Sequence, residues 1–103
     1  MKRDVIAEVE VDAAGRLRVR PGSLLFPLIW RAAAEVHWDD VSRTLFSPKP
    51  RDWTYVDWFT RIIEVVKDEY GVALEIGKST RWVGISHNDR IAMSAIAAST
   101  RQD

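Results

Sequence analysis

Two short runs near the start of the chain alternate between apolar and polar residues, and they constrain the fold more than any other feature. In residues 5–12 valine and alanine occupy the odd positions and mostly acidic residues the even ones, while in residues 16–20 Leu17 and Val19 alternate with three arginines. A period of two residues is typical of β-strands with one buried face. The connector Asp-Ala-Ala-Gly ends at Gly15, which suits a three-residue hairpin loop. The pattern therefore predicts an antiparallel hairpin.

In the register that this turn imposes, each arginine lies opposite a carboxylate. The predicted pairs are Asp12 with Arg16, Glu10 with Arg18, and Glu8 with Arg20. Cross-strand ion pairs that are exposed contribute about 0.2–1 kcal/mol each. We therefore interpret the three arginines as a paired, solvated face of the hairpin, and not as a phosphate-binding stripe.

The middle of the chain predicts two helices. Proline at the first helical position loses no hydrogen bond, so Pro27 suits a helix start, and apolar residues at helical spacing continue to Val36. Thr54 with Asp57 three residues later predicts a second helix that begins with a capping box. Gly71 is placed to end that helix in the left-handed conformation.

The remaining segments predict short strands and a last helix. Residues 36–38 and 44–46 are compatible with a short hairpin, and residues 72–76 and 81–85 alternate in the manner of a second hairpin. Ser86 precedes an acidic residue by three positions, which predicts a capped helix start. We expect its buried stripe to be rich in alanine and to comprise Ile91, Ala95 and Ala98, flanked by Met93 and Ile96.

The predicted order of elements is therefore β-β-α-β-α-β-β-α. Hairpins at both ends favour the α+β class, with an antiparallel or mixed sheet of four to five strands and helices on one face. A chain of 103 residues suffices for one core, so we expect a single domain over residues 1–103 with frayed ends at about 1–3 and 100–103.

Composition excludes several classes of function. The chain has no cysteine, which rules out disulfides, thiolate catalysis and zinc sites that need cysteine. Fifteen basic and fifteen acidic residues cancel, which argues against nucleic acid as a partner. No run approaches the roughly 20 apolar residues of a membrane span, and acidic residues occupy the place of a signal peptide's apolar run. We expect a cytoplasmic protein without a membrane partner.

Residues 35–59 hold three of the five tryptophans and one of the two histidines. Tyr55, Trp58 and Phe59 lie on the apolar face of the predicted second helix, and we interpret them as core. Aromatic and charged residues outside that face could recognise a ligand, particularly where a helix N-terminus favours an anion. The candidate ligand-binding residues are His37, Trp38, Asp39, Lys49, Arg51 and Trp53. The alternative is that Trp38 and Trp53 are core and that Arg51 pairs with Asp39, Asp52 or Asp57.

Catalytic and metal-binding patterns are weak. His37 with Asp39 and Asp40 is a poor metal-ligand set, because the only other histidine lies fifty positions away. Ser86 and His87 are sequence neighbours, which rarely gives catalytic geometry, and Ser86 already serves as a helix cap. No glycine-rich phosphate loop follows a strand. We expect no catalytic residue, no bound metal and no cofactor.

Motifs in the same segment resemble a known family. They are E-V-x-W-D at residues 35–39 and S-P-K-P-R-x-W-T-Y-x-x-W-F at residues 47–59, followed by a helix and V-x-L-x-I at residues 72–76. The pattern is similar to that of small bacterial proteins encoded by mobile integron gene cassettes, over roughly residues 8–86. The resemblance implies a compact α+β domain and carries no catalytic residues over to this chain.

Three classes of function remain open. The first is a non-catalytic binding module that takes a small molecule or a protein partner into an aromatic, charged cleft. The second is a structural or regulatory protein that self-assembles into a homo-oligomer through the alanine-rich last helix. The third is a hydrolase-like enzyme using paired carboxylates such as Asp39 and Asp40, which a raised carboxylate pKa would favour. Stacking of single-stranded nucleic acid on Trp38 and Trp53 is a weaker variant of the first class.

Overall fold

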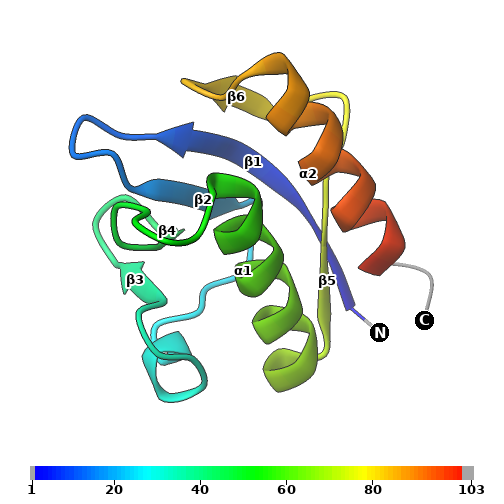
Figure 1. Ribbon diagram of the computed structural model, residues 1–103. Helices are drawn as coiled ribbons and strands as arrows, with labels where there is room; N and C mark the ends of the chain where they lie inside the picture. Colours follow the sequence, from blue (N-terminus) through cyan, green and yellow to red (C-terminus); the bar gives the residue numbers. More distant parts are fainter. Residues whose placement is uncertain (1, 101–103) are drawn as a thin grey trace.

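A mixed sheet with both helices on one face forms the frame of the molecule (Figure 1). The part of the chain that the computed structural model describes is residues 2–100. The strand order is β3-β4-β2-β1-β5, and β6 also pairs with β1. The elements are β1 (Lys2–Val11), β2 (Leu17–Pro21), the 3-10 turn η1 (Ile29–Arg31), β3 (His37–Asp39), β4 (Thr44–Phe46), α1 (Tyr55–Tyr70), β5 (Val72–Glu75), β6 (Arg81–Val83) and α2 (His87–Thr100).

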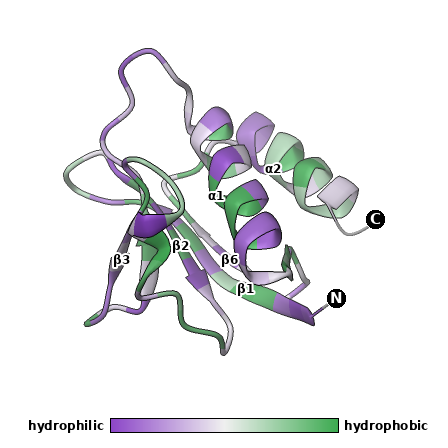
Figure 2. Cartoon of the chain, turned by 90° about the horizontal axis from the view of Figure 1, so that it is seen from below, coloured by the Kyte–Doolittle hydropathy of each residue, from purple (hydrophilic) through white to green (hydrophobic). Residues whose placement is uncertain are grey.

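The predicted α+β class is confirmed, and the sheet has six strands where four to five were expected. Figure 2 shows α1 and α2 on the same side of the sheet. Neither helix is both long enough and apolar enough to cross a membrane, as far as residues 2–100 are concerned. The predicted fraying falls partly on residues 1 and 101–103, which lie outside the described residues. Lys2 and Arg3 lie in β1, and Thr100 lies in α2.

The predicted register of the first hairpin is confirmed. β1 and β2 pair antiparallel, with Glu8 opposite Arg20 and Val9 opposite Val19. Val9 and Val19 are fully buried, so this face of the hairpin belongs to the core. The predicted ion pairs are only partly correct, since Glu8 lies 3.7 Å from Arg81 of β6 instead of pairing with Arg20.

A bulge in β1 reverses the expected faces at its start. The register shifts between Ile6 and Glu8, so Ile6 is buried and Val5 is 42% exposed. The prediction that Val5 shares the buried face of Val9 is wrong, because one extra residue moves every preceding side chain to the other face. The hydroxyl of Thr80 donates a hydrogen bond of 2.7 Å to the carbonyl of Ile6, which satisfies this acceptor at the bulge.

The helix predicted to start at Pro27 and end near Val36 does not form. The segment contains only the single turn η1, without a side-chain cap at Leu28, and Glu35 leaves it with a φ of 66°. Helix nucleation is unfavourable, and most helical stability comes from packing. This loop instead buries separate side chains beneath it, namely Phe26, Ile29, Ala33 and Val36.

α1 forms as predicted. Thr54 accepts a hydrogen bond from the Asp57 backbone N–H (3.1 Å), and the Asp57 carboxylate accepts one from the Thr54 backbone N–H (2.9 Å), which completes a capping box. Gly71 ends the helix with a φ of 65°, where its N–H donates to the carbonyl of Lys67. The buried face consists of Trp58, Phe59, Ile62, Ile63, Val65 and Val66.

The prediction that residues 72–76 and 81–85 form a hairpin is wrong. β5 and β6 both run parallel to β1, with β5 beside residues 2–5 and β6 beside residues 8–10. Residues 72–74 are buried in succession, which is typical of a parallel strand covered on both faces. The short hairpin of residues 36–46 does form, since β3 and β4 pair antiparallel.

α2 starts as predicted but turns a different face to the core. The Ser86 hydroxyl accepts a hydrogen bond from the Asp89 backbone N–H (3.2 Å) and caps the helix. Met93 and Ala97 are buried, whereas Ile91 is 58% exposed. The predicted stripe through Ile91 is therefore wrong. Apolar residues occur on all sides of this helix, so their spacing does not select one face.

Candidate functional site

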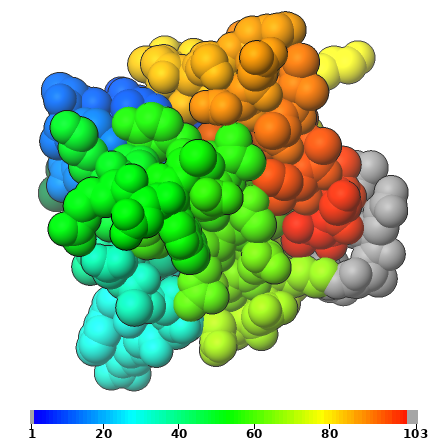
Figure 3. All heavy atoms as spheres, in the orientation of Figure 1, coloured from blue at the N-terminus to red at the C-terminus, as the bar shows by residue number. Residues whose placement is uncertain are grey.

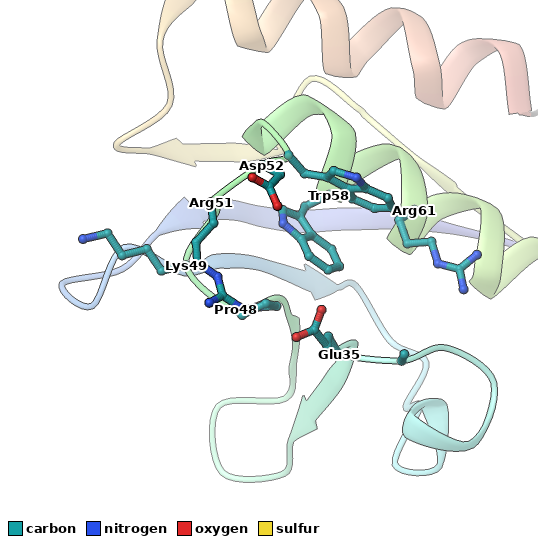
Figure 4. A pocket seen from close by; sticks show the side chains of 9 residues that line it. Glu35, Pro48, Lys49, Arg51, Asp52, Trp58 and Arg61 are labelled. Atoms are coloured by element: carbon teal, nitrogen blue, oxygen red, sulfur yellow. The ribbon is translucent and has the colours of Figure 1, made fainter.

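A pocket of about 380 Å³ opens beside the N-terminus of α1 (Figure 4). One wall comes from the start of α1 and the preceding loop, and the other comes from Glu35 and Pro48. On the face shown in Figure 3, residues 45–60 (green) lie between the η1 segment (cyan) and α2 (orange). Sites for small molecules have volumes of about 300–1,000 Å³. The pocket is therefore large enough for a small molecule.

A pair of indoles forms the apolar part of the pocket. The rings of Trp53 and Trp58 have centroids 4.8 Å apart and are tilted by 50°. Trp58 lies in the first turn of α1 and is only 8% exposed, which confirms its prediction as core. Trp53 precedes the N-cap Thr54 and is 46% exposed, so it leaves aromatic surface in contact with solvent. Contact with the buried Trp58 therefore limits the movement of the Trp53 ring.

Charged side chains of both signs surround these indoles. The cations are Lys49, Arg51 and Arg61, and the carboxylates are Glu35 and Asp52. Within residues 2–100, none of these five forms an ion pair or a side-chain hydrogen bond. Their hydrogen-bonding groups are therefore free to meet a ligand.

The alternative pairing of Arg51 with Asp39, Asp52 or Asp57 does not occur in the part of the chain that the structure describes. Asp39 pairs with Arg18, and Asp57 caps α1. Arg51 therefore has no structural role through an ion pair, which leaves its side chain available at the pocket.

Glu35 carries backbone strain at the edge of the pocket. Its φ of 66° lies in the left-handed region, which costs a residue with a Cβ roughly 1–2 kcal/mol. Such strained positions cluster at functional sites, where the surrounding structure holds them. Figure 4 shows the Glu35 carboxylate directed across the pocket toward Trp58. We therefore regard Glu35 as a candidate ligand contact.

The structure brings together three of the six candidate residues. Lys49, Arg51 and Trp53 line the pocket. The other three, His37, Trp38 and Asp39, lie in β3 at the edge of the sheet and do not line the pocket. His37 packs on Phe46 with ring centroids 5.2 Å apart, and Trp38 packs edge-on against Phe26 at 6.1 Å.

Asp39 belongs instead to an ion cluster centred on Arg18. The Arg18 guanidinium donates hydrogen bonds to Asp12 (2.7 Å) and Asp39 (3.1 Å). Arg16 donates to the same carboxylate oxygen of Asp12 at 3.1 Å. The predicted pair of Asp12 and Arg16 is confirmed, whereas Arg18 bonds these two aspartates and not Glu10. This cluster ties the first hairpin to the hairpin of β3 and β4.

The cluster lowers the pKa of both of its carboxyl groups. Burial acts to raise the pKa of Asp12, but hydrogen bonds from Arg18 and Arg16 outweigh it and bring the pKa to about 2. Hydrogen bonds from Ser42, together with that of Arg18, lower the pKa of Asp39. A general acid needs a raised carboxyl pKa, so Asp39 gives the enzyme hypothesis no support.

We expect the free energy of unfolding to fall as the pH drops from about 4 toward 2. The pKa of Asp12 is about 2 in the folded state and about 3.9 in an unfolded chain, so its contribution is complete above pH 4 and is lost as the pH falls through the folded value. Urea unfolding at several pH values measures this loss. Asp12→Asn should unfold with a shallower pH dependence in this window, and an unchanged dependence would contradict the cluster.

Three charged lining residues, Glu35, Asp52 and Arg61, are not among the candidates that the sequence indicates. Arg61 lies three positions after Trp58 on α1, and this helical spacing could have placed it beside the pocket. For Asp52 the sequence suggests only an ion pair with Arg51. The direction of Glu35 depends on its left-handed backbone, which no local sequence signal indicates.

The sheet, the two helices on one face and the indole pocket define an α+β fold with a concave candidate binding site. The family described as Integron Cassette Protein Hfx_Cass5 matches residues 4–80. The chain therefore belongs to this family, which confirms the resemblance noted in its motifs.

A solved structure of integron cassette protein Hfx_Cass5, from the mobile metagenome of the North West Arm sewage outfall, is 41% identical to this chain. The similarity covers 95% of this chain and 98% of that one, with a TM-score of 0.48. No curated protein matches the chain.

Proposed function

We propose that the chain is a binding module that holds a small molecule in the pocket of Trp53 and Trp58. Packing of the half-exposed Trp53 against the buried Trp58, inside a pocket of about 380 Å³, supports this proposal. Small-molecule sites combine such apolar walls with a few polar groups that fix orientation. Here Glu35, Arg51 and Asp52 supply those groups.

The pocket suits a small molecule better than it suits the flat surface of a protein partner. The recognising groups come from three separate segments, the η1 loop, the loop before α1 and α1 itself, and they converge on one concavity. The start of α1 is fixed to the β1–β2 turn, because the hydroxyl of Tyr55, the first residue of α1, donates a hydrogen bond of 2.9 Å to the carbonyl of Gly15. A ligand thus meets a pocket whose walls are already in place, which reduces the cost of ordering on binding.

A thermal-shift screen of amino acids, nucleotides and aromatic acids tests the proposal. We expect at least one compound to raise the melting temperature of the native chain, because a ligand at 100 times its Kd stabilises a fold by about 2.7 kcal/mol. Trp53→Ala should abolish the shift, since it removes the exposed ring. Trp30→Ala is the matched control, because Trp30 is 57% exposed and does not line the pocket.

Two results would reject the proposal. One is a screen in which no compound changes the melting temperature. The other is a shift that persists unchanged in Trp53→Ala, because the ligand would then bind elsewhere on the molecule.

A further inference from the structure

We infer that the ligand of this pocket is a zwitterion with an aromatic or other apolar side group, of the chemical class of the α-amino acids. The inference rests on the proposed function and deepens it. Three observations lead to it: charges of both signs on one pocket, the strained backbone that directs Glu35, and the exposed aromatic surface of Trp53.

The two signs of charge select against ligands with a single charge. An anion would gain Arg51 as a partner but would approach the carboxylates of Glu35 and Asp52. A cation would gain the carboxylates but would approach Arg51. Charges moved out of water without a partner cost free energy, on the ligand as well as on the protein. A zwitterion provides a partner for each sign.

The arrangement of the side chains fits such a ligand. Figure 4 shows Arg51 reaching from the loop before α1 toward Pro48, and Glu35 directed toward Trp58 from the opposite wall, while Lys49 and Arg61 extend outward. A ligand carboxylate can accept two parallel hydrogen bonds from the Arg51 guanidinium. An ammonium group beside it can donate to Glu35. The side group then lies against the indoles, where stacking adds to the area it buries.

The strain at Glu35 is consistent with a role as ammonium acceptor. A glycine would adopt the φ of 66° without cost, yet the chain has glutamate at this position. The carboxylate makes no hydrogen bond or ion pair within residues 2–100, so its interactions inside the protein do not repay the strain. Contact with a ligand would do so.

A set of three probes, measured by isothermal titration calorimetry, tests the inference. L-phenylalanine carries both charges, phenethylamine lacks the carboxylate, and 3-phenylpropionate lacks the ammonium group. We expect L-phenylalanine to bind most tightly and each analogue to bind about tenfold more weakly, as for the loss of one charge-assisted hydrogen bond.

Two variants assign each charge to its partner. In Glu35→Gln, L-phenylalanine should lose most of its advantage over 3-phenylpropionate, because the neutral amide removes the negative charge that pairs with the ammonium group. In Arg51→Gln, L-phenylalanine and phenethylamine should bind equally. Glu64→Gln is the matched control, since Glu64 is exposed on α1 and does not line the pocket, and it should retain the native preference.

The outcomes distinguish failure of the zwitterion inference from failure of the proposed small-molecule binding. If one analogue binds as tightly as L-phenylalanine and Trp53→Ala abolishes that binding, the zwitterion is wrong and the proposed function stands. If none of the three probes binds, the inference is overturned, and the thermal-shift screen decides the proposed function independently. If Glu35→Gln lowers the affinity for all three probes by the same factor, the assignment of Glu35 to the ammonium group is also overturned.

Discussion

Replacing Phe59 by alanine is expected to lower the free energy of unfolding by about 3–5 kcal/mol. Phe59 is fully buried on the face of α1 that packs toward the sheet. Its removal takes apolar surface out of the core and leaves a cavity, because the surrounding structure relaxes only partly. Domains of this size are stable by only about 5–15 kcal/mol, so the variant should lose a large part of its stability.

Urea unfolding followed by tryptophan fluorescence measures this loss. Glu64→Ala is the control on the same helix, because Glu64 is exposed and its removal should change stability by no more than about 0.5 kcal/mol. A loss below about 1 kcal/mol for Phe59→Ala would show that α1 does not bury this side chain, because full burial of phenylalanine costs several times more to undo.

Replacing Asp4 by alanine is expected to cost about 2–3 kcal/mol. Asp4 is 7% exposed, and its carboxylate accepts hydrogen bonds from the backbone N–H of Ser23 (3.1 Å) and of Leu24 (2.9 Å). These bonds hold the chain as it leaves β2. Alanine would leave both N–H groups without their acceptor, and a buried polar group without a partner is costly.

Asp4→Asn is the matched control, since it keeps one oxygen acceptor and nearly the same shape. It should lose less stability than alanine does. Hydrogen exchange gives a local measurement, because the amides of Ser23 and Leu24 should exchange faster in Asp4→Ala. Unchanged exchange at both amides would mean that the carboxylate does not hold this loop.

The first hairpin and α1 could be predicted from sequence because short-range rules determine them. The register of β1 and β2 follows from the turn that ends at Gly15 and from the alternation of side chains. The limits of α1 follow from the Thr54 capping box and from Gly71. Each signal lies within a few residues of the feature that it indicates.

The errors concern features set by contacts between distant segments. β5 and β6 pair with β1, about seventy residues earlier in the chain, so their alternation could not reveal that they do not pair with each other. The η1 segment has helical spacing, yet packing of Phe26 and Val36 determines its path. At the bulge in β1, the carbonyl of Ile6 accepts a hydrogen bond from Thr80, which is also remote in sequence.

The candidate site was half predictable for the same reason. Lys49, Arg51 and Trp53 lie within five residues of one another and directly before α1, so locating the helix also locates them. His37, Trp38 and Asp39 depend on the direction of the β3–β4 hairpin, and the Arg18 cluster holds Asp39 away from the pocket. Glu35 reaches the pocket only through its backbone conformation.

The central claim is that a small molecule binds against Trp53 and Trp58, and indole N–H resonances test it most directly. The chain has five tryptophans, so a ¹H–¹⁵N spectrum should contain five indole signals, which single substitutions assign. Titration with L-phenylalanine, or with the best compound of the thermal-shift screen, should move the signals of Trp53 and Trp58 and leave those of Trp30 and Trp82 in place. Movement confined to Trp30 or Trp82, or no movement at saturating concentration, would contradict the claim.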